Sequence, residues 1–205
     1  MTVARDRVVD AKRGFDLVVS ALLLLVTLPL SVVLAVAVRL TSKGPAFFRQ
    51  ERVGLQGETF RIHKFRSMKV DHSRELVSRT GDSRVTRVGR FLRRSKLDEL
   101  PQLLDVFVGH MSLVGPRPEV PKYVAMWPAE SRQVILSVRP GITDPASIQL
   151  RNEADEIAAA GDPERHYIES LLPRKTAIYV DYVNGRSFSG DLAVIARTLA
   201  AVIRN

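Results

Sequence analysis

Residues 17–38 read LVVSALLLLVTLPLSVVLAVAV, a run of 22 residues without a single ionisable side chain. As a straight helix this run would be about 33 Å long, enough to cross a hydrocarbon core of roughly 30 Å. A secretory signal sequence is the competing interpretation, but the run is long for one, and no small-residue cleavage site follows it. Helices buried in soluble proteins rarely stay apolar on every face. The run therefore predicts a helix inserted in a membrane.

Pro29 lies near the middle of this run, where a proline removes an intrahelical hydrogen bond and bends the helix. Thr27 and Ser31 flank it, and their hydroxyls can satisfy backbone groups freed by a bend. A spanning helix carries basic residues mainly on its cytoplasmic side, whereas here both flanks are basic. We therefore expect a re-entrant helix-hairpin that enters and leaves one leaflet, with a simple span as the alternative. The basic flanks are Arg5, Arg7, Lys12 and Arg13 before the run, and Arg39, Lys43, Arg49 and Arg52 after it.

The composition limits the partners of the chain. Its 205 residues fit one domain with an appendage, which we divide into a membrane anchor, residues 1–40, and a cytoplasmic domain, residues 41–205. The 31 Lys and Arg against 22 Asp and Glu give a formal net charge of +9, which favours an anionic partner. There is no cysteine, and the four histidines show no metal-ligand spacing. A disulfide framework and a zinc site are therefore not expected.

After the apolar run the pattern predicts a mainly helical α/β fold with a small β-hairpin. Two short runs around Gly54–Gly57 indicate the hairpin, within residues 45–68. Residues 70–83 are polar and indicate a loop or a loosely held helix. The segments 85–95, 102–108 and 191–203 show helical spacing, and we expect amphipathic helices at the membrane interface. The apolar positions are Val85, Val88, Phe91 and Leu92 in the first segment, and Leu192, Ile195, Leu199, Val202 and Ile203 in the last.

Asp98 and Glu99 follow an arginine-dense segment, and Arg117 stands between Pro116 and Pro118. One interpretation is structural, because Ser95-x-x-Asp98 resembles a capping box and Pro101 suits the first turn of a helix. The other is chemical: one carboxylate can attack phosphorus while its neighbour helps to hold a divalent metal. Arginines would then neutralise the phosphate oxygens. Spacing alone leaves both interpretations open.

Three strings carry a resemblance to a known family: KRGFDLVVSALLLL (12–25), VGRFLRRSKLDELPQL (88–103) and MSLVGPRPEVP (111–121). They are similar to the bacterial sugar transferases, the monotopic phosphoglycosyltransferases that begin glycan assembly on a polyprenyl phosphate carrier. HKFRSM (63–68), RPGIT (139–143) and PRKTAIYVDYV (173–183) extend the likeness, which covers nearly the whole chain. We therefore expect a small, single-domain member of this family.

The resemblance implies roles for individual residues. Asp98 and Glu99 match the family's catalytic acids, with Asp98 attacking the β-phosphate of a nucleoside diphosphate sugar, such as a UDP-sugar, to form an aspartyl phosphosugar intermediate. Mg²⁺ would bind near the same two acids. Lys64, Arg93 and Arg117 match basic positions around the family site, and we assign them to phosphate binding. The acceptor would be polyprenyl phosphate, such as undecaprenyl phosphate, and UMP would be released.

The implied location is the cytoplasmic face of the bacterial inner membrane, in contact with membrane lipids, and no nucleic-acid partner is expected. The formation of a homodimer is left open. There are two departures from the family pattern. Leu28 precedes Pro29, where relatives often have serine. DPASIQLRNE (144–153) stands where many relatives share a different string, so the resemblance does not indicate which sugar is transferred. The alternative function is a catalytically inactive, membrane-tethered scaffold or a module that binds anionic ligands.

Overall fold

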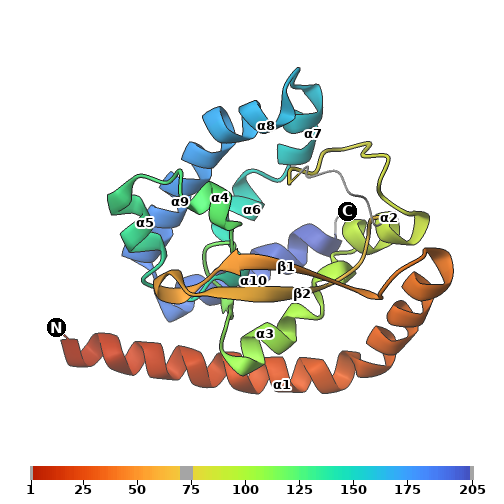
Figure 1. The fold of residues 1–205 in the computed structure, drawn as a ribbon. Coiled ribbons are helices and arrows are strands. Elements are labelled where there is room, and N and C mark those ends of the chain that lie inside the picture. Colours follow the sequence, from red (N-terminus) through yellow and green to blue (C-terminus); the bar gives the residue numbers. More distant parts are fainter. Residues whose placement is uncertain (1, 70–75, 204–205) are drawn as a thin grey trace.

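The computed structural model describes residues 2–69 and 76–203. It is mainly helical, as predicted, and its longest element is α1, Thr2–Thr41, which contains the whole apolar run. By length and composition, Ala11–Thr41 could cross a membrane. The helix continues through Pro29, but Figure 1 shows its C-terminal part turning away from the direction of its N-terminal part. A proline inside a helix accounts for such a kink. The re-entrant hairpin itself stays a prediction.

One side of α1 packs on the rest of the protein, and the other side is left open. Leu34 and Val38 are buried in a cluster with Phe65 and Leu92. The opposite side exposes many large apolar side chains, and a continuous apolar surface of this kind needs a lipid or protein cover. We infer that lipid covers it. The side chains on it that are at least half exposed are Val18, Leu22, Leu25, Val26, Leu28, Val32, Val33, Val36 and Leu40.

The predicted hairpin is confirmed. Strand β1, Phe47–Val53, pairs antiparallel with β2, Thr59–Phe65, in a register that runs from Phe47 opposite Phe65 to Val53 opposite Thr59. A short 3-10 turn, Leu55–Gly57, joins them. The hairpin places Lys64 on a strand that lies against α3, Gln102–Val108. Of the polar segment 70–83, residues 70–75 lie outside the described part, and residues 76–83 form loop and turns without helix.

Helices α2, Arg87–Arg94, and α3 occupy the two central segments that were predicted to be helical. The predicted apolar stripe of the first is only partly buried, because Leu92 is inaccessible while Phe91 is 58% exposed. The capping interpretation of Asp98 is wrong. Ser95 lies at the C-terminal end of α2, where its hydroxyl donates to the carbonyl of Phe91, and α3 begins only after Pro101. Asp98 lies between the two helices and caps neither.

A second, parallel strand pair was not predicted. Strand β3, Ser112–Val114, pairs with β4, Gly141–Thr143. The two strands can approach only because Gly115 and Gly141 lack side chains: a Cβ on Gly141 would lie 2.1 Å from the backbone nitrogen of Gly115. The amide of Gly141 also donates to the carbonyl of Pro116 at 2.9 Å. This contact fixes the chain directly before Arg117.

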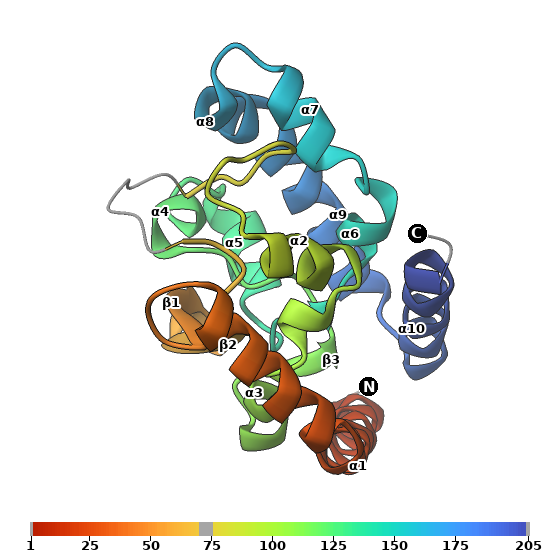
Figure 2. The same cartoon turned by 90° about the vertical axis from the view of Figure 1, so that its right-hand side faces the viewer.

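The remaining helices surround the C-terminal core. Figures 1 and 2 place α7 and α8 at one end of the molecule and α1 and α3 at the other. The predicted C-terminal helix is confirmed, but Val194 and Ile195 pack inward while Leu192 and Leu199 are 42% and 58% exposed. The elements are α4 Pro121–Val124, α5 Ala129–Ile135, α6 Pro145–Gln149, α7 Glu153–Ala159, α8 Pro163–His166, a π-helical turn Tyr167–Leu171, α9 Leu172–Gly185 and α10 Phe188–Ile203.

Candidate active site

A strained turn between α2 and α3 positions the two acids. Lys96 adopts φ 56° and ψ 14°, a left-handed conformation that is uncommon for a residue other than glycine. The chain then continues as a single 3-10 turn over Leu97–Glu99. Backbone strain of this kind costs free energy and persists where the surrounding structure enforces it, often at functional sites. The turn directs Asp98 and Glu99 into the interior instead of along a helix.

Glu99 is the electrostatic centre of the site. Its Oε1 accepts hydrogen bonds from Lys64 Nζ at 2.7 Å and from Arg117 Nη2 at 2.5 Å. Burial alone would raise the pKa of Glu99, but the charges of Arg117 and Lys64 hold that pKa well below its usual range. Conversely, the pKa of Arg117 is raised well above its usual value, chiefly by Glu99. Glu99 and Arg117 are therefore both ionised at neutral pH.

Asp98 is in the opposite situation. It is 8% exposed, and its buried Oδ1 accepts no hydrogen bond from the described residues. Burial raises the pKa of Asp98, and the neighbouring charge of Glu99 raises it further, against the opposing charges of Lys64, Arg93 and Lys96. A buried carboxylate oxygen without a donor is costly in a folded protein. Such an oxygen is suited to bind or attack an electropositive centre.

Three of the five predicted chemical residues are in direct contact, and the other two lie beside them. Lys64 from β2, Glu99 from the turn and Arg117 from the segment after β3 form one ion-pair cluster. The guanidinium of Arg93 makes no hydrogen bond or ion pair with the described residues, but its charge lowers the pKa of Asp98. It is half-buried on the last turn of α2. Pro29 lies on α1, outside the cluster, as its expected role in the membrane segment requires.

A second layer of side chains holds the segment around Arg117, and sequence reasoning missed it. Arg52, at the end of β1, donates from Nη1 to the carbonyl of Pro118 at 3.0 Å. The hydroxyl of Tyr167 donates to Glu119 Oε1 at 2.5 Å, and the amide of Val53 donates to the carbonyl of Glu119 at 2.9 Å. The charge of Arg52 had suggested only a membrane flank. The position of Glu119 directly after Pro-Arg-Pro was the one signal that could have indicated this layer.

The strand that carries Lys64 is anchored in a similar way. Asp105 of α3 is inaccessible to solvent, and it accepts from the backbone amide of His63 at 2.9 Å and pairs with His63 Nδ1 at 2.7 Å. The contact joins β2 to α3 one residue before Lys64. It therefore fixes the position of Lys64 relative to Glu99. The sequence had assigned no role to His63 or Asp105.

The unfamiliar segment 144–153 begins beside Arg117. Asp144 is fully buried, caps α6 by accepting from the amide of Ser147 at 2.9 Å, and is one of the charges that raise the pKa of Arg117. Burial raises the pKa of Asp144 itself, although Ser147 and Arg117 oppose that effect. Tyr179 of α9 lies close enough to act on both groups, and its buried hydroxyl has no partner among the described residues. The departure from the family pattern therefore adjoins the cluster.

No preformed cage for a metal ion is present among residues 2–69 and 76–203, because no three His, Cys, Asp or Glu side chains gather there. Asp98 and Glu99 are the adjacent pair of carboxylates that the described residues offer at the cluster. Mg²⁺ is commonly bound by one or two carboxylates together with substrate phosphates, so two acids do not exclude it.

Comparison with known proteins gives the cluster a context. The family model described as "Bacterial sugar transferase" matches residues 7–205. A UDP-glucose:undecaprenyl-phosphate glucose-1-phosphate transferase of Caulobacter vibrioides is 38% identical over 94% of this chain and 69% of its own length. A protein of the same name from Klebsiella pneumoniae is 43% identical over 92% of this chain, but over only 39% of its own length.

A third relative is named for a different sugar. The UDP-N-acetylgalactosamine-undecaprenyl-phosphate N-acetylgalactosaminephosphotransferase of Aeromonas hydrophila is 37% identical over 78% of this chain and 39% of its own length. The chain thus spans about two fifths of the Klebsiella and Aeromonas relatives. Similarity at this level extends across proteins that are named for different donor sugars.

Proposed function

Because the chain belongs to the bacterial sugar transferase family, we propose that it transfers a phosphosugar from a nucleoside diphosphate sugar to polyprenyl phosphate. The products are a polyprenyl diphosphate sugar and a nucleoside monophosphate, and the reaction is a first membrane step of glycan assembly. The relatives' names support a UDP-sugar donor and undecaprenyl phosphate as acceptor. The observation that carries the proposal is the unpartnered carboxylate oxygen of Asp98 beside a Glu99 that two cations hold.

Asp98 is the nucleophile in this proposal. A carboxylate oxygen of Asp98 attacks the β-phosphorus of the donor, and the bond from that phosphorus to the bridging oxygen breaks, so that UMP leaves with the bridging oxygen. The product on the enzyme is an aspartyl phosphosugar, an acyl phosphate. A phosphate oxygen of the acceptor then attacks the same phosphorus, and Asp98 leaves as a carboxylate. Two displacements at one centre restore the free enzyme.

Lys64 and Arg117 serve as the phosphate-binding cations. Both donate to the same oxygen of Glu99, so their charged groups converge on a small volume beside Asp98. Preorganised donors of this kind stabilise the charge of a phosphoryl transition state without reorganisation at the moment of reaction. Glu99 positions both cations. Arg93 contributes charge beside Asp98 without a fixed partner, which leaves its guanidinium available to a phosphate oxygen.

Mg²⁺ is proposed as the cofactor, held by Asp98 and Glu99 together with the phosphates of the donor. The fit rests on the buried Oδ1 of Asp98, which lacks a donor, and on Glu99, which uses only Oε1 for its two hydrogen bonds. Bound there, a magnesium ion would withdraw charge from the phosphate oxygens. Chelation should abolish turnover, and added Mg²⁺ should restore it.

We propose that the reaction takes place at the cytoplasmic face of the inner membrane. The exposed apolar side of α1, together with the half-exposed Phe91, Phe107 and Val108 on α2 and α3, supports immersion of this end of the molecule in lipid. A re-entrant α1 would keep both of its ends on the side of the soluble donor. The carrier lipid would then meet the donor at the interface.

A direct assay tests the proposed function against an inactive scaffold or binding module. The purified full chain in nanodiscs is given polyprenyl phosphate, Mg²⁺ and a panel of UDP-sugars, and release of UMP is measured. Release of UMP beyond one equivalent per enzyme that requires both the acceptor and one of the sugars supports the transferase. Donor binding without release, with every sugar of the panel, would instead favour the scaffold or binding module.

A further inference from the structure

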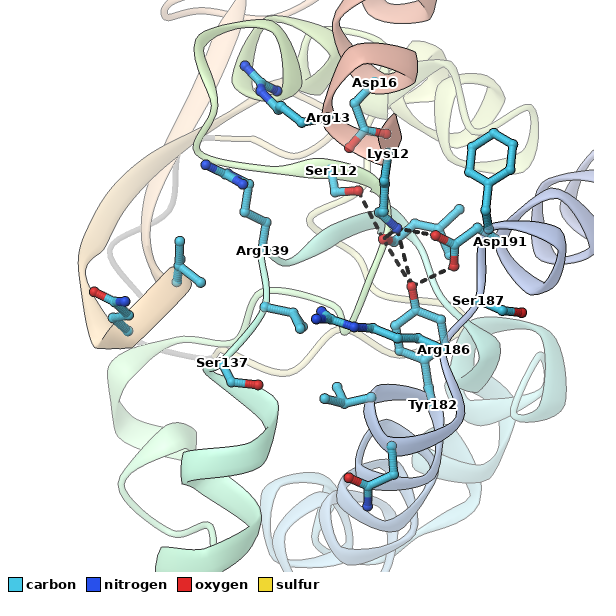
Figure 3. Close-up of a pocket in the computed structure, with 17 residues that line it drawn as sticks. Lys12, Arg13, Asp16, Ser112, Ser137, Arg139, Tyr182, Arg186, Ser187 and Asp191 are labelled. Carbon is cyan, nitrogen blue, oxygen red and sulfur yellow. Dashed lines mark hydrogen bonds and ion pairs between the residues drawn. The ribbon is translucent and has the colours of Figure 1, made fainter. Parts of the chain in front are cut away.

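A pocket of about 400 Å³ lies apart from the acid cluster and shares no residue with it. Figure 3 shows side chains from α1, β3, the segment before β4, α9 and α10 around this space. The volume falls within the range of about 300–1,000 Å³ that is usual for small-molecule sites. Neither the mechanism above nor the family comparison gives this pocket a role.

The pocket carries a net positive charge. Four cationic side chains line it, Lys12, Arg13, Arg139 and Arg186, whereas the acidic ones are only Asp16 and Asp191. Lys12 is neutralised by an ion pair with Asp191. The other three cations form no ion pair with the described residues, although Asp16 lies close enough to Arg13 to oppose the lowering of its pKa by burial and by Arg139. An unbalanced group of arginines in a concave site favours an anionic ligand.

Two of these arginines are fixed in place without being neutralised. Arg13 donates from Nη1 to the carbonyl of Val106 at 2.6 Å and from Nη2 to that of Phe107 at 2.9 Å, and Arg139 donates from Nε to the carbonyl of Gly109 at 2.9 Å. All three carbonyls lie at the C-terminal end of α3, where cations are favoured. A neutral carbonyl orients a guanidinium but leaves its full charge, so both remain available to a ligand.

The third arginine is Arg186. The guanidinium of Arg186 forms no hydrogen bond or ion pair within the described part of the chain, although it is only partly exposed. It lies in the short link between α9 and α10, and Figure 3 shows it extending into the space between Arg139 and Tyr182. The hydroxyl of Tyr182 donates to Asp191 Oδ1 at 2.7 Å, and that of Ser112 donates to the carbonyl of Val114 at 3.0 Å. The guanidinium groups are therefore the donors that this space offers to a phosphate group.

The position of the pocket along α1 favours an anionic ligand that is found at the membrane surface. Lys12, Arg13 and Asp16 belong to the turns directly before Leu17, where the apolar run begins. Phe188 of α10 lines the pocket and packs edge-to-face on Phe15, with ring centroids 5.3 Å apart. If the apolar run enters lipid at Leu17, the pocket lies at the depth of the phospholipid headgroups. A phosphate at that depth would join α1 to the link between α9 and α10.

We propose that this pocket binds a phosphate group, either of a membrane phospholipid headgroup or as free phosphate, between Arg13, Arg139 and Arg186. The ligand is separate from the two substrates of the proposed reaction. The phosphate would bind only the folded state, in which the segments that carry these three arginines come together, so binding should stabilise the fold. This stabilisation can be measured without any assay of activity.

The test is a titration of the full chain in neutral detergent, followed by thermal unfolding. Sodium phosphate is compared with sodium chloride at equal ionic strength, and short-chain phosphatidylglycerol is compared with short-chain phosphatidylcholine. A ligand that binds only the folded state raises the unfolding midpoint in a saturable way. A rise with phosphate assigns a free anion, whereas a rise with phosphatidylglycerol alone assigns the lipid headgroup.

Variants locate the site. Arg186→Gln should weaken the apparent affinity by about tenfold or more, because one charge-assisted contact is lost, and it should leave the ligand-free midpoint unchanged. Arg151→Gln removes the same charge from an exposed position outside the pocket and should bind like the unmodified protein. Ser137→Asp, at the exposed edge of the pocket, adds a negative charge and should weaken binding independently.

The proposal is overturned by two results. The first is the absence of a saturable rise with either ligand. The second is a rise that persists in Arg186→Gln and Ser137→Asp but disappears in Arg117→Ala, because the phosphate would then be bound at the acid cluster.

Discussion

Arg117 Nη2 lies 2.5 Å from Glu99 Oε1, so the Pro-Arg-Pro segment and the acid pair, 18 residues apart in the chain, share one buried ion pair. Lys64 reaches the same oxygen from a different element. A single carboxylate therefore aligns two cations that come from β2 and from the segment after β3. Asp98, its neighbour in sequence, makes none of these contacts and keeps a free oxygen.

This division between the two acids predicts opposite effects on stability. Asp98→Asn should abolish turnover, because a carboxamide is a far poorer nucleophile than a carboxylate. The unfolding midpoint at pH 7 should stay the same or rise, because burial raises the pKa of Asp98 and the ionised form therefore costs stability. Mass spectrometry of the unmodified enzyme with donor alone should detect a phosphosugar on Asp98. Substantial turnover by the Asn variant would remove Asp98 from the nucleophile's role.

Glu99→Gln should lower both activity and stability. The substitution leaves Lys64 and Arg117 as a buried pair of like charges, and breaking a buried ion pair typically costs about 3–5 kcal/mol. Denaturant unfolding of the variant measures the loss. Glu58→Gln is the matched control, since Glu58 is exposed and its side chain forms no hydrogen bond within the described part of the chain. Equal stability of the two variants would show that Glu99 does not hold the cations together.

Arg117→Ala should reduce kcat by about a hundredfold to a thousandfold, the effect of removing one preorganised donor from a transition state. Arg117→Lys keeps the charge but loses the planar fork, so it should recover activity only in part. Steady-state rates for both variants, with the fold checked by circular dichroism, measure the effect. Full activity of the Ala variant would give Pro-Arg-Pro a purely structural role.

The acid limb of the pH–rate profile should follow the ionisation of the Asp98 carboxyl group. Because burial and Glu99 raise its pKa, turnover should fall, as pH is lowered, at a pH above the ordinary value for aspartate, about 3.9. Arg93 opposes that rise, so Arg93→Gln should move the limb to still higher pH. Arg90→Gln, an exposed arginine on the same helix, is the control and should leave the limb in place. Identical profiles for both variants would contradict a charge effect of Arg93 on Asp98.

The topology of α1 can be tested with single cysteines, since the chain has none. Ala11→Cys and Ala158→Cys place a thiol at exposed positions on either side of the apolar run. In intact spheroplasts a re-entrant helix should protect both thiols from a membrane-impermeant reagent, and both should react after lysis. Pro29→Leu restores the missing hydrogen bond, so part of the population should then span the membrane and expose Ala11→Cys to the outside. Labelling of that site from outside without the proline change would establish a simple span.

Much of the fold could be read from local pattern. The apolar run, the hairpin around Gly54–Gly57 and the helices α2, α3 and α10 depend on periodicity and turn residues that neighbouring positions supply. The capping interpretation of Ser95 and Asp98 failed because a capping box specifies only a local pattern. The local pattern did not indicate that Lys96 adopts a left-handed conformation, which directs the two acids into the interior.

The tertiary structure decided which charges meet. Resemblance could name Asp98, Glu99, Lys64, Arg93 and Arg117 as a set, but it could not tell that Glu99 takes both cations while Asp98 keeps an unpaired oxygen. That outcome depends on β4 packing against Gly115, and on Asp105 fixing the strand of Lys64. These contacts join residues 25 or more positions apart. The sequence by itself determined the long apolar helix, the local elements and the candidate residues, because these follow from neighbouring side chains. Only the packed chain decided the pairing of charges at the acids and the unbalanced arginines beside α1, because both depend on distances between remote segments.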